Sequence, residues 1–290
     1  MQGTTYTMAN TRNVTTTTTA SNYEFDNKTL VPVYPNVPEG PYVNRPGELA
    51  MPSKYILTKT HCGGYCTNCK PNRYALDVAK FDEACRTSRV KSSNQTTSWT
   101  YPKSRIDKAI HLIRDPFDNI ISRLHFASKK VQRLSGLSVD QLQRFSQSER
   151  AGYLAWCDYL DSSQYSQMLE SRLISDSVKT FLRENTLPCA SEWFRYVRWH
   201  NLAIELENNN VNMRVLYLHY ESYSTNYNQT LQSILDFLEL PWNRKSLPFI
   251  AGKTYHTYYT VNEAQVAKKF VEMFATPEVW VHIERYFNWF

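Results

Sequence analysis

The stretch Ala109-Ile-His-Leu-Ile-Arg-Asp-Pro-Phe-Asp-Asn-Ile-Ile-Ser-Arg-Leu-His125 decides the fold class of this chain. Its first five residues form a short apolar run, which predicts a buried strand. Asp115 and Pro116 then supply a helix N-cap residue followed by proline at the first helical position. This order of strand, tight turn and helix places Arg114 at the carboxyl end of a strand. In an open α/β sheet, ligands bind at that edge.

A second candidate for anion binding follows on the helix. Ser122 lies about two turns beyond Pro116, so its hydroxyl and the guanidinium of Arg114 can converge on one anion. The alternative is that Arg114 pairs with Asp118 at the surface and that Ser122 is an ordinary helical serine. Because single motif matches have a high false-positive rate, other segments of the chain have to decide between the two.

The residues from Arg114 to Ser122 resemble the sulfotransferase segment that holds the 3'-phosphate of PAPS (3'-phosphoadenosine 5'-phosphosulfate), with the arginine and the serine at the same spacing. The resemblance implies transfer of a sulfuryl group from PAPS, as co-substrate, to an acceptor hydroxyl, with no metal. It also implies a three-layer α/β/α domain with a central parallel sheet, similar to the P-loop nucleotide folds but without their first strand.

The sequence Lys59-Thr60-His61 resembles the motif that carries the catalytic base in cytosolic sulfotransferases. The residues before it, from Tyr55 to Thr58, predict a strand. Sulfuryl transfer requires an acceptor hydroxyl that loses its proton as it attacks sulfur, and the unperturbed pKa of histidine lies nearest to neutral pH. The resemblance implies that His61 is the catalytic base and that Lys59 assists it. The alternative is a structural role, which is more common for a histidine taken by itself.

Gly3-Thr4-Thr5-Tyr6 resembles the Gly-Thr-Thr-Trp end of the family's 5'-phosphosulfate loop, a strand-to-helix turn whose backbone amides and hydroxyls cradle phosphate. The family's loop reads Pro-Lys-Ser-Gly-Thr-Thr. Met1 therefore stands where its lysine would be, and Gln2 stands at its serine. We expect either a chain that is truncated within this loop or a degenerate relative of the enzymes.

Two later segments extend the resemblance. Trp193-Phe194-Arg-Tyr-Val resembles the segment whose aromatic side chain contacts adenine, which puts Phe194 at that position, although aromatic residues at such spacing are more often core residues. The strand expected from Arg214 onward and the helix expected from Thr230 to Leu240 resemble a late strand and helix of the family. Lys253 occupies the region of the family's basic loop over the 3'-phosphate.

Length and composition fit one sulfotransferase-like domain over residues 1–290, since 42% of the residues are hydrophobic and can bury a sizeable core. The net charge of +6 suits an acidic ligand, but it is spread along the chain and equally suits a solvated surface. It gives no indication of nucleic acid as a partner. No apolar run reaches the roughly 18 residues that would span a bilayer.

A helical insertion is expected at about residues 137–190. Capping residues and periodicity favour two or three helices there, which begin near Ser138, Ser148 and Ser163. Such an insertion could shape the acceptor site, or its helices could simply pack on the core.

Four of the six cysteines crowd into the segment that follows His61: Cys62, Cys66, Cys69 and Cys85. Their spacing permits a zinc site, and the even total, with Cys157 and Cys189, permits disulfides. We favour disulfides, partly because a zinc ion on His61 would remove the base. The loop over residues 61–86 would then form the rim of the acceptor pocket.

Glycosylation sequons and a second resemblance indicate the secretory pathway. The sequons begin at Asn13, Asn27, Asn94 and Asn228. The residues from Ser21 to Leu30 resemble the Tyr-x-x-Asp-x-x-Leu stretch of Golgi-type, WSC-domain-associated carbohydrate sulfotransferases. This resemblance implies the Golgi lumen, a carbohydrate or glycoprotein acceptor, and membrane association through a segment outside this chain. Two other classes stay open: a non-catalytic nucleotide-binding relative and a zinc-stabilised interaction module.

Overall fold

The computed structural model describes residues 4–10, 55–62, 74, 76–91, 96–100, 102–131, 138–147, 149–210, 212–242, 249–250 and 252–290. The strands are β1 (Thr4–Asn10), β2 (Tyr55–Thr60), β3 (Thr87–Lys91), β4 (Thr96–Thr100), β5 (Ile106–Ile113) and β6 (Arg214–His219). The helices are α1 (Val78–Arg86), α2 (Pro116–Val131), α3 (Val139–Ser146), α4 (Arg150–Leu169), α5 (Asp176–Glu184), α6 (Ala190–Asn208), α7 (Ser222–Thr225), α8 (Tyr227–Leu238), α9 (Val261–Phe274) and α10 (Pro277–Ile283).

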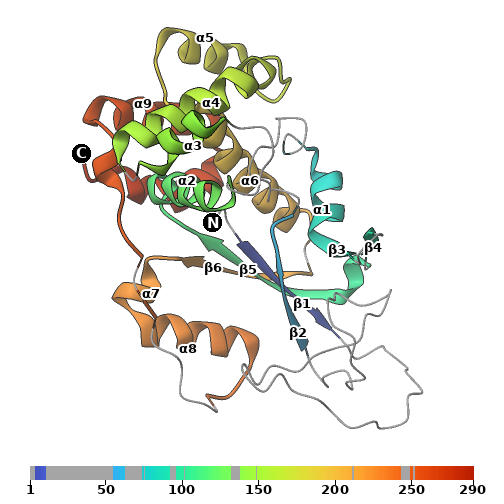
Figure 1. Cartoon of the computed structure of the whole chain (residues 1–290). Coiled ribbons are helices and arrows are strands. Elements are labelled where there is room, and N and C mark those ends of the chain that lie inside the picture. The colour runs from blue at the N-terminus through green and yellow to red at the C-terminus, as the bar shows by residue number, and fades with distance from the viewer. Residues whose placement is uncertain are drawn as a thin grey trace.

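The central sheet has four strands in the order β2-β1-β5-β6 (Figure 1). Strands β5 and β6 are parallel, in a register that pairs Ile113 with His219. Strand β1 is antiparallel to β2 and to β5, so β2, β5 and β6 all run in one direction. The expectation of a central parallel sheet is therefore only partly met: three strands share a direction, but β1 lies between two of them in the opposite sense.

Residues that were expected to form the phosphate loop lie in strand β1. Thr4, Thr5 and Tyr6 lie in a strand that is paired on both sides, with Thr5 opposite Thr60 in β2 and opposite His111 in β5. A strand paired on both sides uses its backbone amides in the ladders, so they are not available to cradle phosphate. The run of β-branched and aromatic residues explains this strand, because such residues favour extended backbone. Gly3 lies outside the described residues.

Helices cover both faces of the sheet at β5 and β6. Side chains alternate along β5, because successive residues of a strand point to opposite faces. Ile110 and Leu112 pack toward α8, whereas His111 bonds to α6 on the other face. Figure 1 shows α7 and α8 below the sheet and most of the other helices above it. The chain is thus mostly helical around a small sheet, within the α/β class.

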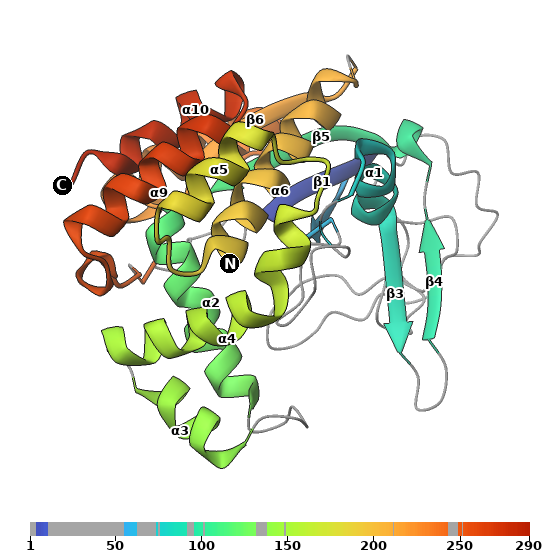
Figure 2. The same ribbon diagram turned by 90° about the horizontal axis from the view of Figure 1, so that it is seen from above.

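The main core lies where α2, α4, α6 and α9 meet above the sheet. It contains Phe117, Trp156, Trp193 and Phe270, each at most 2% exposed. The hairpin of β3 and β4 stands apart from these helices, beside α1 (Figure 2). Because α2 follows directly from β5, this core fixes the direction in which the chain leaves the sheet at Arg114.

The helical insertion is present, with boundaries that differ from the expected ones. Helix α3 begins after Ser138, which forms a capping box with Gln141. Helix α4 runs without a break from Arg150 to Leu169, so no helix begins at Ser163. The next helix, α5, has Ser175 as its N-cap residue. Ser163 instead donates its hydroxyl to backbone carbonyls one turn earlier in α4, which lets a serine stay inside a helix.

Candidate active site

The candidate site lies at one edge of the sheet. His61 follows β2, Arg114 follows β5 and Tyr220 follows β6, and these three strands run in the same direction. Their carboxyl ends therefore meet at the same edge, where open α/β sheets bind ligands. The topology thus places two segments that the sequence singled out separately at one edge of the sheet, the expected base after β2 and the expected phosphate contact after β5, with β1 between the two strands.

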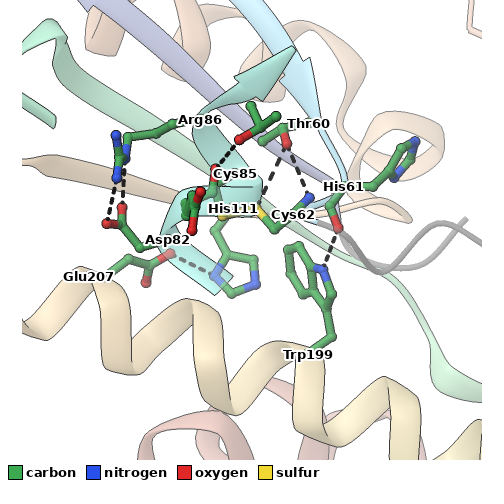
Figure 3. The surroundings of a disulfide bond; sticks show 11 residues. Thr60, His61, Cys62, Asp82, Cys85, Arg86, His111, Trp199 and Glu207 are labelled. Carbon is green, nitrogen blue, oxygen red and sulfur yellow. Dashed lines mark hydrogen bonds and ion pairs between the residues drawn. A yellow bond between two sulfur atoms is a disulfide. The ribbon is translucent and has the colours of Figure 1, made fainter. Parts of the chain in front are cut away.

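His61 is held at this edge through its backbone. The indole Nε1 of Trp199 in α6 donates a hydrogen bond to the carbonyl oxygen of His61 over 3.0 Å (Figure 3). Burial lowers the pKa of His61 from 6.5 to about 4, and the positive charges of Lys59 and Arg123 act in the same direction. The imidazole is therefore neutral at pH 7.

A disulfide fixes the residue after His61. Cys62 is bonded to Cys85 in α1, and its backbone N–H donates to Thr60 Oγ1 over 3.1 Å. A second disulfide joins Cys157 to Cys189. The preference for disulfides is confirmed for these four cysteines, so neither Cys62 nor Cys85 is a thiolate ligand for zinc. Cys66 and Cys69 lie outside the described residues.

Arg114 is buried, with 9% of its surface exposed. Its guanidinium lies over the ring of Tyr220, 4.7 Å from the centroid, and Tyr196 donates to its backbone carbonyl over 2.7 Å. The Nε of Arg114 is buried and has no hydrogen-bond partner among the described residues. Asp118 is 5% exposed, so a surface ion pair between it and Arg114 is wrong.

The turn between Arg114 and Ser122 has the predicted local structure. Asp115 Oδ1 accepts a hydrogen bond from the backbone N–H of Phe117 over 2.8 Å, and Pro116 is the first residue of α2. Asp115 thus caps the helix as the sequence indicated. Ser122 is half-buried on α2, about two turns further along.

The segment that contains Lys253 passes over Arg114. A methyl group added at Gly252 would lie 3.7 Å from Arg114 Nη2 and 3.4 Å from Tyr220 Cε1, so the backbone approaches both side chains closely. Lys253 is the next residue, and its side chain is exposed. The structure therefore brings Lys253 to the neighbourhood of Arg114, although the two residues are 139 positions apart in the sequence.

Phe194 lies in the main hydrophobic core. It is fully buried, with its ring 5.0 Å from that of Phe274 and 5.9 Å from that of Tyr74. A side chain with no exposed surface cannot stack on an adenine without a rearrangement of the core. Phe194 is therefore a core residue, and its expected contact with adenine is wrong for this structure.

A buried group of charges lies next to the expected base. Glu192 in α6 forms ion pairs with Arg123 of α2 and with Arg195, and both Glu192 and Arg195 are 1% exposed. Arg195 precedes Trp199 by one helical turn, so this group lies one turn from the contact that holds His61. The group carries one more positive than negative charge.

Sequence reasoning missed the role of the acidic residues around Arg114. Asp115 Oδ2 accepts a hydrogen bond from His256 Nε2 over 2.8 Å, and the backbone N–H of Asp115 donates to Glu221 Oε1 over 3.0 Å. Asp118 Oδ1 accepts from the backbone N–H of Tyr255 over 2.6 Å. These contacts join residues more than 100 positions apart, and no local pattern marks them.

His111 has a structural role. It is fully buried on β5, with Nδ1 3.0 Å from Glu207 Oε1 and Nε2 2.8 Å from His200 Nδ1. An imidazole engaged at both nitrogens and shielded from solvent cannot reach an acceptor hydroxyl. His61 is therefore the better placed of these two histidines to act as a base.

Within the described ranges, no three His, Cys, Asp or Glu side chains gather in a way that could hold a metal ion. None of the described helices is both long and apolar enough to cross a bilayer.

The fold and this edge define an α/β protein with a buried arginine at the carboxyl ends of its strands. The family model of the sulfotransferase domain matches residues 83–285. The chain therefore belongs to the sulfotransferase family, and sulfuryl transfer is the reaction that this domain indicates. Arg114, Ser122 and Lys253 lie inside the matched region, whereas Lys59 and His61 precede it. No curated protein and no solved structure matches the chain.

Proposed function

We propose that this protein transfers the sulfuryl group of PAPS to an acceptor hydroxyl, and that Arg114 binds the 3'-phosphate of the donor. The observation that carries the proposal is the buried Nε of Arg114, which has no hydrogen-bond partner in the described part of the chain. A buried polar group without a partner costs free energy, and a phosphate oxygen would supply the missing acceptor. Guanidinium groups suit phosphate because they donate in a planar fork.

Three residues would hold the 3'-phosphate. Arg114 is fixed by the ring of Tyr220 and by the N-cap turn that follows it. Ser122 on α2 offers a hydroxyl, and Lys253 offers a positive charge from the segment that passes over Arg114. The family membership supports this donor, because sulfotransferases generally use PAPS.

His61 would be the general base. Transfer forms a bond between the acceptor oxygen and sulfur, and breaks the bond between sulfur and the bridging phosphate oxygen, which keeps the electron pair. The acceptor proton passes to His61, whose lowered pKa keeps it neutral before the reaction. Lys59 and Arg123 would add positive charge next to the transferred group, where negative charge develops.

We further propose a carbohydrate acceptor and a lumenal location in the Golgi. The two disulfides support an oxidising compartment, since disulfides are rare in the cytosol. Asn228 of one sequon is exposed near the start of α8, so its side chain is accessible to solvent. The helices α3, α4 and α5 would contribute to acceptor recognition.

A specific observation favours a second candidate, a non-catalytic relative that binds the nucleotide. Strand β1 occupies the place where the phosphate loop was expected, and its backbone amides lie in two ladders. Such a protein would bind 3',5'-bisphosphoadenosine and would transfer no sulfate.

The binding proposal is tested with Arg114→Ala and with 3',5'-bisphosphoadenosine and AMP, which lacks the 3'-phosphate. Wild-type protein should bind the bisphosphate more tightly than AMP, and Arg114→Ala should lose about 1.5–3 kcal/mol, roughly tenfold to a hundredfold in affinity, for the bisphosphate alone. Calorimetric titration measures both affinities. Arg214→Ala is the control, because Arg214 is an exposed arginine at the opposite end of β6. Equal affinity of wild-type protein for both nucleotides would refute the assignment.

A further inference from the structure

The segment 252–259 is fastened to the first turn of α2 by three contacts. The backbone N–H of Tyr255 donates to Asp118 Oδ1 over 2.6 Å. His256 Nε2 lies 2.8 Å from Asp115 Oδ2. The hydroxyl of Tyr259 donates to the backbone carbonyl of Phe117 over 3.1 Å. The segment is therefore held by the same turn that follows Arg114.

The other end of the segment lies over Arg114. Gly252 approaches the guanidinium so closely that a methyl group there would be 3.7 Å from Nη2, and Lys253 comes next. The contacts made by Tyr255 and His256 are separated from Lys253 by only one and two residues. Holding Tyr255 and His256 in place consequently restricts where the side chain of Lys253 can reach.

His256 is itself held in place by its contacts with Trp289 and Asp115. Its ring stacks on that of Trp289, with the centroids 4.3 Å apart and an angle of 14° between the planes. Burial disfavours its charged form, but the hydrogen bond to Asp115 and the charges of Asp115, Asp118 and Glu221 outweigh burial and raise its pKa. His256 and Asp115 therefore form a charge-assisted contact, which is stronger than a neutral one.

Without these contacts, holding the side chain of Lys253 against a ligand would cost more conformational entropy. An exposed lysine on a loop samples many rotamers, and a ligand that it contacts has to offset the loss of this freedom. A segment fixed before binding reduces that loss. The contact that fixes it is formed by Asp115, which is adjacent to Arg114 in the chain, so the arginine and the segment belong to one connected unit.

We propose that His256 is a positioning residue of the donor site, which holds the segment 252–259 through Asp115 so that Lys253 reaches the phosphate bound by Arg114. This inference rests on the proposed function. It assigns to His256 an effect on the 3'-phosphate alone, because the segment lies over Arg114.

The test is a double-mutant cycle on His256 and Lys253 with two ligands, 3',5'-bisphosphoadenosine and AMP. Lys253→Ala should weaken binding of the bisphosphate roughly tenfold, as expected for loss of one charged contact. His256→Ala should cause a similar loss, and the double variant should lose no more than either single variant, because His256 acts through Lys253. Affinity for AMP should stay within about twofold in all three.

Two further variants separate positioning from loss of folding. His256→Gln keeps an N–H donor for Asp115 and should recover most of the affinity. His282→Ala is the matched control, since His282 is also half-buried and stacked on an aromatic ring, that of Tyr217 at 4.3 Å. It should leave the ratio of the two affinities unchanged.

The outcomes distinguish this inference from the proposed function. If wild-type protein binds both nucleotides equally, the donor assignment is wrong and the inference falls with it. If wild-type protein prefers the bisphosphate but His256→Ala keeps that preference, only the inference is wrong. It is also wrong if the losses of the two single variants multiply in the double variant, or if His256→Ala weakens both nucleotides alike.

Discussion

The rate of sulfuryl transfer should stay nearly constant from pH 8 down to about pH 5.5, because His61 loses its proton far below neutral pH. Burial and the charges of Lys59 and Arg123 lower its pKa to about 4. At pH 5.5 an imidazole with a pKa of about 4 is roughly 97% neutral, whereas one with the unperturbed pKa of about 6.5 is roughly 9% neutral. The two cases differ about tenfold in the amount of active base at that pH.

The assay follows labelled sulfate from PAPS to an acceptor and records kcat/KM between pH 5 and pH 8, since this parameter reports the free enzyme. Each sample is returned to pH 7 to show that activity recovers and that the protein stayed folded. His61→Ala should lower the rate by about two to four orders of magnitude across the range, while affinity for the nucleotide changes little. An acid limb centred near pH 6.5, or full activity of His61→Ala, would refute the reasoning.

Two predictions concern stability. Glu192→Gln should destabilise the fold by about 3–5 kcal/mol in urea unfolding, because it removes the buried carboxylate that the buried Arg195 and the half-buried Arg123 share. Glu263→Gln, whose partner Arg150 is 36% exposed, should cost about 1 kcal/mol or less, and equal costs would contradict the account. Asp161 accepts hydrogen bonds from the backbone of the first residues of α6. Burial raises its pKa to about 6, above the value in the unfolded chain, so the carboxyl group stays protonated to higher pH in the folded protein. Wild-type protein should therefore lose about 2 kcal/mol relative to Asp161→Asn as the pH rises from about 4 to about 7, and a constant difference would contradict this.

The unit from β5 to α2 could be predicted because its signals are local. An apolar run, Asp115 as cap and Pro116 at the first helical position each act within a few residues, and the structure has all three. The helix start at Ser138 and the strand from Arg214 were predictable for the same reason. Local signals fix where elements begin, and the direction of β2, β5 and β6 then places Arg114 and His61 at one edge.

The features that could not be predicted depend on contacts distant in sequence. Thr4 to Tyr6 fit a phosphate loop by resemblance and a strand by propensity, and pairing with β2 and β5 decides for the strand. Phe194 matches a family position, but the packing of Tyr74 and Phe274 against it decides its burial. His256 reaches Asp115 across 141 positions, so nothing near either residue in the sequence reveals the contact.

The most direct test of the central claim is whether the purified chain moves labelled sulfate from PAPS to a panel of glycans, with phenols and a tyrosine peptide alongside. The account predicts transfer to at least one glycan, with 3',5'-bisphosphoadenosine as the second product in equal amount. It predicts that Arg114→Ala raises the KM for PAPS and that Arg214→Ala does not. Binding of the bisphosphate without transfer to any acceptor would contradict the claim and would identify the protein as the non-catalytic relative.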